Sequence, residues 1–246
     1  IQAIKKGDLE TALEVITPLA DDADQLSLDT YADILYLTGG YQKAFNIWAD
    51  LDQELTLEQA LRESQGREKP EQVVLASRSL HAINPEKFTA NLAFALISAG
   101  KNDQAIKVLN DSIQTFSGSS DQSKWFRYLG DAYTGQEKWS EAESAYFQAL
   151  DLDPSNQKAS RNLAFMYQNL LDRYWRDNQI DLAIEILNKA LAFDEDNIEF
   201  LLRAGQIYES TGDHTQAIGA YQKVLELDPE HPEALQAVQR LLNSND

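Results

Sequence analysis

The chain has 246 residues and a formal net charge of −19 at pH 7, with 40 Asp and Glu against 21 Lys and Arg. Binding to nucleic acid or to an anionic membrane surface needs Lys and Arg to displace counterions, so this charge argues against both as partners. The absence of cysteine excludes disulfides, thiol catalysis and Cys-type zinc sites.

The start of the chain lies in the middle of a helical pattern, and its first residue is Ile1 rather than Met. We therefore interpret the sequence as a fragment or a processed product, which a signal peptide or an anchor could precede. Cytoplasmic and periplasmic locations both stay open. No run of residues approaches the roughly 20 apolar positions of a membrane span, so we expect no membrane insertion by this chain.

A short turn signal recurs along the chain, in which Gly ends one helical segment and Ala, five residues later, begins the buried face of the next. Gly tolerates the left-handed conformation that follows a helix, and Ala lets two helices approach closely. Pro, which cannot continue a helix, follows three of the second helices, at 85, 154 and 229. The signal occurs at Gly7 and Ala12, Gly39 and Ala44, Gly100 and Ala105, and Gly212 and Ala217.

Two 34-residue segments, Ser123–Asn156 and Ile198–His231, share one pattern of aromatic, Leu, Gly, Tyr, Ala and Pro positions. The first carries Phe126, Leu129, Gly130, Tyr133, Ala142, Tyr146, Ala149 and Pro154, and the second carries Leu201, Gly205, Tyr208, Ala217, Tyr221 and Pro229. This pattern resembles the tetratricopeptide repeat family. The resemblance extends loosely over nearly the whole chain.

The resemblance implies an all-α fold, a right-handed superhelical solenoid of antiparallel helix pairs that forms a single domain over residues 1–246. We expect a truncated repeat at 1–22, repeats at 25–58, 55–86 (degenerate), 87–120, 123–156, 157–197 and 198–231, and a capping helix at 231–246. The capping helix repeats apolar residues at Leu235, Val238, Leu241 and Leu242.

The repeat at 157–197 breaks the period, because sixteen residues separate Tyr167 from Ala183 where the strong repeats have nine. Seven extra helical residues add roughly 10 Å to its first helix. Tyr174 and Trp175 lie on this extension, either folded back on an adjacent helix or exposed as a docking or self-association site.

Nothing in the sequence indicates catalytic, cofactor or metal chemistry, so we expect a protein that is not an enzyme. His81, His214 and His231 form no pair with ligand spacing, and no Gly-rich phosphate loop is present. The acidic runs at 21–24 and 194–197 lack the spacing of a calcium loop. We interpret these groups as surface and helix-capping residues.

Helical periodicity places a set of polar and aromatic residues on the first helices of the last four repeats, which line the concave groove of such a solenoid. Six of the 21 basic residues fall in this set, and they predict a groove for an acidic partner segment. The alternative is that these cations pair with Asp and Glu of neighbouring helices. The predicted groove residues are Lys87, Asn91, Phe94, Lys124, Arg127, Tyr128, Asp131, Lys158, Arg161, Asn162, Phe165 and Arg203.

Some members of the family clamp the C-terminal carboxylate of a peptide, and Arg127, Asn162 and Arg203 match three of the five clamp positions. Asp131 and Glu199 stand at the other two and would repel a carboxylate. The resemblance therefore implies a more general protein-interaction scaffold, such as an assembly factor in a bacterial cell envelope. A self-associating array, or the repeat part of a larger anchored protein, is the alternative.

Overall fold

The computed structural model describes residues 11, 14, 17, 25–66 and 69–243. This described part contains thirteen helices and no strand, which confirms the all-α expectation. The expected truncated repeat at 1–22 lies almost entirely outside the described residues. The chain divides into two compact units, Ile1–Ala159 and Ser160–Asp246, which we describe separately.

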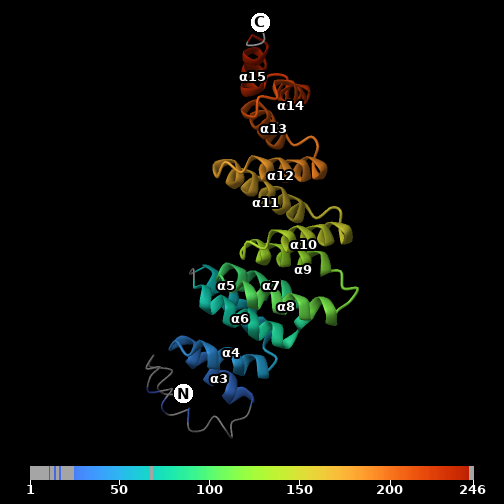
Figure 1. Ribbon diagram of the computed structural model, residues 1–246. Helices are drawn as coiled ribbons and strands as arrows, with labels where there is room; N and C mark the ends of the chain where they lie inside the picture. Colours follow the sequence, from blue (N-terminus) through green and yellow to red (C-terminus); the bar gives the residue numbers. More distant parts are fainter. Residues whose placement is uncertain (1–10, 12–13, 15–16, 18–24, 67–68, 244–246) are drawn as a thin grey trace. The chain divides into compact units, whose positions relative to one another are not determined.

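The first unit stacks four helix pairs, drawn in blue to yellow-green in Figure 1. Within it, each helix packs on its partner. Contacts between successive pairs run from α4 to α5 and α6, from α6 to α7, and from α7 and α8 to α9. The helices are α3 (Gln25–Leu37), α4 (Tyr41–Asp50), α5 (Glu54–Gly66), α6 (Pro70–Ile83), α7 (Pro85–Ser98), α8 (Asn102–Thr115), α9 (Gln122–Thr134) and α10 (Trp139–Leu152).

The second unit holds two further pairs and a last single helix, drawn in orange to red in Figure 1. Its first helix has 20 residues where the first helix of the next pair has 13. The helices are α11 (Gln157–Arg176, whose first three residues belong to the first unit), α12 (Ile180–Phe193), α13 (Ile198–Ser210), α14 (His214–Leu227) and α15 (Pro232–Asn243).

In the five helix pairs whose turn the structure describes in full, the turn uses a left-handed residue, as the Gly–Ala signal predicts. Gly39, Gly100 and Gly212 have φ of 93°, 71° and 81°. Two pairs lack the glycine, yet Glu137 and Asn178 take the same position with φ of 57°. The alanine five residues later is fully buried in all five pairs: Ala44, Ala105, Ala142, Ala183 and Ala217. The buried alanine therefore marks this turn more reliably than the glycine does.

Two helix pairs cross at a glycine that faces a tyrosine ring. A Cβ added to Gly130 on α9 would lie 2.5 Å from Cε1 of Tyr146 on α10, and one added to Gly205 on α13 would meet the Tyr221 ring in the same way. Neither ring has room to move, because Tyr146 and Tyr221 are 2% and 1% exposed. These contacts require glycine for its lack of a side chain rather than for its backbone freedom.

The hydroxyls of the same two tyrosines donate hydrogen bonds to carboxylates. Tyr146 Oη lies 2.8 Å from Asp131, and Tyr221 Oη lies 3.3 Å from Glu209. Burial, reinforced by Glu209, raises the pKa of Tyr221 to about 12. Burial and Asp131 raise the pKa of Tyr146 further above its ordinary value.

The last helix packs in a different register from the one its apolar pattern predicts. Of the four apolar residues named above, only Leu241 is buried, whereas Leu235 and Leu242 are 39% and 53% exposed. Ala234 and Ala237 face α14 instead and are 0% and 2% exposed. Small side chains allow the closest approach to α14, and the helix is rotated to present them.

We expect Gly130→Ala and Gly205→Ala to lower the free energy of unfolding by about 1–3 kcal/mol each, because the new methyl group overpacks against a buried ring. Gly219→Ala is the control, since this glycine lies inside α14 with open space around its Cα. Alanine there should stabilise by about 0.5–1 kcal/mol. Urea unfolding followed by circular dichroism measures all three, and a stable Gly130→Ala variant would contradict the crossing described above.

We also expect stability to fall above about pH 10, where unfolded tyrosine ionises. The folded-state pKa of Tyr146 and Tyr221 lies higher, so the unfolded chain releases their protons first and stability is lost as the pH rises through the folded-state values. Urea midpoints on either side of about pH 10 test this. In the double variant Tyr146→Phe, Tyr221→Phe, the free energy of unfolding should fall less steeply with pH. If it falls as steeply as in the wild type, groups other than these two tyrosines cause the loss of stability.

Candidate functional site

On α7 and α9, the cations predicted for the groove are paired with carboxylates. Lys87 on α7 pairs with Glu54 and Glu58 of α5, the latter at 3.4 Å, and the hydrogen bond that Lys87 donates to Glu54 raises the pKa of Lys87. Lys124 lies 2.9 Å from Asp121, three residues earlier. These are exposed pairs that solvent screens strongly, so a ligand could replace them at little cost.

Arg127 on α9 is a buried structural residue. Its residue exposure is 7%, and its guanidinium lies 2.9 Å from a carboxylate oxygen of Asp131 and 3.7 Å from the centre of the Tyr128 ring. Asp131 also accepts the hydrogen bond of Tyr146. Removal of Arg127 would leave this partly buried carboxylate without its cation. Arg127 therefore holds α9 and α10 together and presents little surface to a partner.

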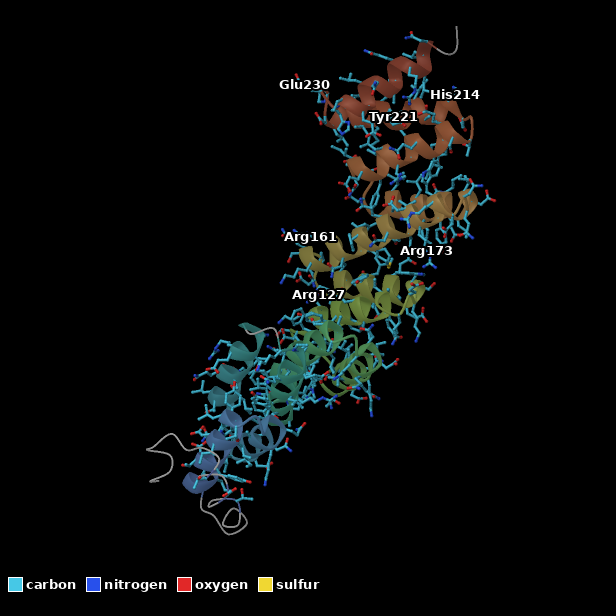
Figure 2. All side chains as sticks on the ribbon, turned by 90° about the vertical axis from the view of Figure 1, so that its left-hand side faces the viewer. Arg127, Arg161, Arg173, His214, Tyr221 and Glu230 are labelled. Carbon is cyan, nitrogen blue, oxygen red and sulfur yellow. The ribbon has the colours of Figure 1, made fainter. Side chains whose placement is uncertain are left out.

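The predicted cations of α11 and α13 divide into two kinds. Arg203 on α13 pairs with Asp172 on α11 and donates to Gln206 at 2.9 Å. Lys158 and Arg161, at the start of α11, are exposed and have no carboxylate partner among the described residues. Figure 2 labels Arg127 and Arg161, which illustrate the engaged and the free kind. Four of the six predicted cations are thus paired. Lys87 and Arg203 pair with acids of a neighbouring helix, as in the alternative interpretation of the sequence, whereas Lys124 and Arg127 pair with acids three and four residues away.

An exposed aromatic residue continues the free face of α11. Phe165 follows Lys158 and Arg161 at spacings of seven and four residues, so all three share one side of the helix. Phe165 is 61% exposed, and Asn162 beside it is half-buried. This face combines two free cations with an apolar ring.

On the first unit, two predicted aromatic residues meet. The rings of Phe94 on α7 and Tyr128 on α9 lie 6.2 Å apart at a tilt of 55°, and Phe94 remains 49% exposed. Asn91 lies exposed one turn before Phe94. The guanidinium of Arg127 packs on the Tyr128 ring and so helps to hold this ring in position. Together, Phe94 and Tyr128 form a half-exposed aromatic platform.

Phe94 also borders a pocket that the sequence did not predict. The pocket has a volume of about 680 Å³ and opens between α5, α6 and α7. Lys69 at its edge is exposed and has no carboxylate partner in the part of the chain described. The only signal for it in the sequence is the degenerate repeat at 55–86, whose first helix lacks the aromatic residues that fill such spaces elsewhere. The lining residues are Ser64, Gln65, Lys69, Pro70, Val73, Phe94, Ala95 and Ser98.

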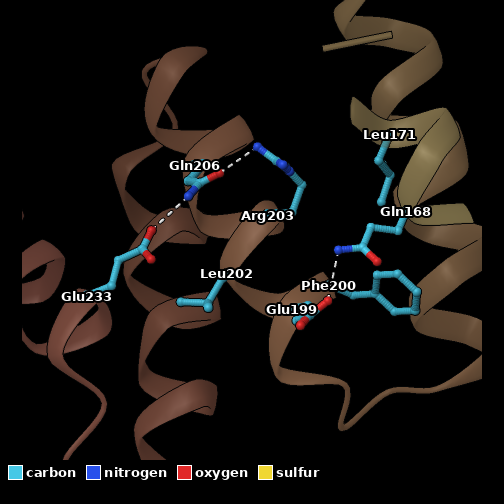
Figure 3. Close-up of a pocket in the computed structure, with 8 residues that line it drawn as sticks. All are labelled: Gln168, Leu171, Glu199, Phe200, Leu202, Arg203, Gln206 and Glu233. Carbon is cyan, nitrogen blue, oxygen red and sulfur yellow. Dashed lines mark hydrogen bonds between the residues drawn. The ribbon is translucent and has the colours of Figure 1, made fainter. Parts of the chain in front are cut away.

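The second unit carries a smaller, polar pocket of about 180 Å³ between α11, α13 and α15, shown in Figure 3. Two carboxylates line it, and each accepts a hydrogen bond from an amide: Glu199 from Gln168 at 2.9 Å and Glu233 from Gln206 at 2.7 Å. In the sequence, Glu199 stands out as a departure from the clamp pattern, whereas Glu233 belongs to no motif.

Tyr174 and Trp175, the predicted docking or self-association residues, are both half-buried near the end of α11. The carbonyl of Tyr174 accepts the N–H of Gln179 at 2.8 Å, which closes the turn to α12. Their docking role stays a prediction.

Among the described residues, no group of three or more His, Asp and Glu side chains could hold a metal ion. His81 is partly buried, and this burial lowers its pKa, so it is neutral near pH 7. Within the part of the chain described, no helix has the length and apolar character of a membrane span.

Two family models described as tetratricopeptide repeat match residues 91–164 and 174–242. Human Protein O-mannosyl-transferase TMTC1 is 27% identical over 151 residues, which are 61% of this chain and only 16% of that protein.

Two solved structures share the fold. A repeat protein from Bacteroides fragilis has a TM-score of 0.58 at 11% identity, covering 78% of this chain and 98% of its own. The C-terminal part of a repeat-containing protein from Cytophaga hutchinsonii has a TM-score of 0.54 at 17% identity, covering 96% of both chains. With its paired helices and two family matches, the chain belongs to the tetratricopeptide repeat family.

Proposed function

We propose that this chain is a non-enzymatic protein-interaction scaffold that binds a partner segment on the faces formed by its first helices. The observation that carries the proposal is the half-exposed Phe94, which joins the Tyr128 ring on one side and the apolar pocket between α5, α6 and α7 on the other. Aromatic residues beside desolvated pockets are the usual anchors of protein interfaces.

The pocket fits an apolar anchor from the partner. Its volume of about 680 Å³ holds a large side chain, and Pro70, Val73, Phe94 and Ala95 form its apolar lining. A single buried aromatic or aliphatic residue contributes about 1.5–3 kcal/mol to binding. We therefore propose a partner segment with an exposed aromatic or aliphatic residue.

The charge of the partner segment follows from the cations that have no carboxylate partner among the described residues. Lys69 borders the pocket, and Lys158 and Arg161 lie beside Phe165 on α11. A carboxylate next to the apolar anchor would gain Lys69 as a partner without displacing an existing ion pair. Independently of that pocket, Lys158 and Arg161 offer the same attraction to a carboxylate on the face of α11. The proposed segment is therefore acidic as well as apolar, and assembly of a protein complex is the role that it suggests.

The human relative does not extend this proposal to sugar transfer. The match covers 16% of that protein. The resemblance supports the scaffold and gives no argument for the chemistry in that protein's name.

We expect Phe94→Ala and Tyr128→Ala to weaken binding of peptides selected from a random library against the wild-type chain. Loss of an aromatic anchor costs about 2 kcal/mol, or about thirtyfold in Kd. Phe147→Ala is the matched control, because Phe147 is 39% exposed but lies on α10, a second helix. Fluorescence anisotropy measures the affinities. Equal losses in the Phe94 and Phe147 variants would reject the platform.

We expect the double variant Lys158→Ala, Arg161→Ala to weaken binding of acidic selected peptides about threefold to tenfold at low salt, and less at high salt. The control double variant Lys107→Ala, Arg176→Ala removes the same two charges from other exposed positions. If both variants lose the same affinity, only the net charge matters and the α11 face is not the site.

A further inference from the structure

The pocket of the second unit is lined by both apolar and charged residues. Leu171 and Phe200, which are 1% and 2% exposed, line it together with Leu202, and the exposed Glu199 and Glu233 form its rim with Arg203. At about 180 Å³ it is smaller than the roughly 300–1,000 Å³ of small-molecule sites and is close to the size of one long side chain.

The two glutamates on the rim carry charge that no cation balances. Glu199 and Glu233 are bonded only to the neutral amides of Gln168 and Gln206, and neither has a Lys or Arg partner within the ranges described. The neighbouring carboxylates differ: Asp172 is paired with Arg203, and Glu209 with Arg240 at 2.8 Å. Arg203, which also lines this pocket, and Arg240, which lines the neighbouring one, are therefore each paired with another carboxylate.

The amides also hold the rim in place. Arg203 donates to the carbonyl oxygen of Gln206, and the Nε2 of Gln206 donates to Glu233, a relay that Figure 3 shows across the pocket. Gln168 fixes Glu199 in the same manner from α11. A carboxylate already oriented loses less rotamer entropy when a ligand binds it.

We propose that this pocket holds the cationic side chain of a lysine or arginine from a partner segment. The methylene stem packs on Leu171, Phe200 and Leu202, and the charged group reaches Glu199 and Glu233. The uncompensated carboxylates repel an anion, and the described residues provide no cluster for a metal ion. This site is separate from the platform of the first unit, and its charge preference is the opposite one.

A second pocket extends the site. It has a volume of about 540 Å³ and shares Gln206 and Glu233 with the first, so Glu233 forms a wall between the two. Glu209 and Arg240 lie in it as a closed ion pair. A basic segment with consecutive charged residues can therefore place one side chain on each side of Glu233.

The test uses the full chain and a fluorescein-labelled tetralysine peptide, with tetra-aspartate as the opposite-charge probe. The double variant Glu199→Gln, Glu233→Gln should weaken tetralysine binding about tenfold at low salt. The matched control Glu185→Gln, Glu226→Gln removes the same charge from exposed positions on α12 and α14 and should change the affinity less than about twofold.

Equal losses in the two double variants, or no binding of tetralysine to the wild-type chain, would overturn the proposal. Nuclear magnetic resonance of the wild-type chain provides a readout that needs no variant. Tetralysine should shift the amide signals of Gln168, Leu202 and Gln206 more than those on the outer face of α12. Tighter binding of tetra-aspartate than of tetralysine would also overturn the proposal. These measurements do not depend on Phe94 or Tyr128, so the proposal for this pocket and the proposed function of the aromatic platform are tested independently.

Discussion

The close crossing of two helices at a glycine is the contact on which the rest of the structure depends. Gly130 admits the ring of Tyr146, and Gly205 admits that of Tyr221, because neither glycine has a Cβ. The contact fixes the rotation of the first helix about its own axis. Once Gly130 faces α10, the helical period directs Tyr128 and Lys124 away from it, and these are the residues a partner can reach. The packing contact thus decides which side chains form the functional face.

The sequence predicted the helix pairs because their determinants are local. Glycine at the turn, alanine five residues later and proline after the second helix can each be recognised without tertiary information. Where the glycine is absent, Glu137 and Asn178 still take the left-handed turn with φ of 57°. The surrounding packing imposes the conformation there, at a cost of about 1 kcal/mol for a residue with a side chain. The rotation of α15 was not predictable, since Ala234 and Leu235 are equally compatible with a helix.

The candidate site was predicted only in part, because the partners of its charges are distant in the sequence. Periodicity placed Lys87 and Arg203 on the first helices, but their carboxylates are 33 and 31 residues away, on the preceding first helix. These separations are close to one repeat of 34 residues, so the pairing runs from repeat to repeat. A sequence without coordinates does not show which rotamers meet. The pocket beside Phe94 was missed for the same reason: it is a space between three helices and has no motif of its own.

This chain has 40 acidic and 21 basic residues, so most cations on a helix surface have a carboxylate nearby. An ion pair of this kind is therefore weak evidence for or against a ligand site. The exceptions are more informative. Lys158 and Arg161 find no acid in the part of the chain that the structure describes, and a ligand carboxylate would gain their full attraction. Conversely, Glu199 and Glu233 have no cationic partner although Arg203 lines the same pocket, because the guanidinium of Arg203 is paired with Asp172. Charge left over after local pairing, rather than charge counted along the sequence, determines what each face can bind.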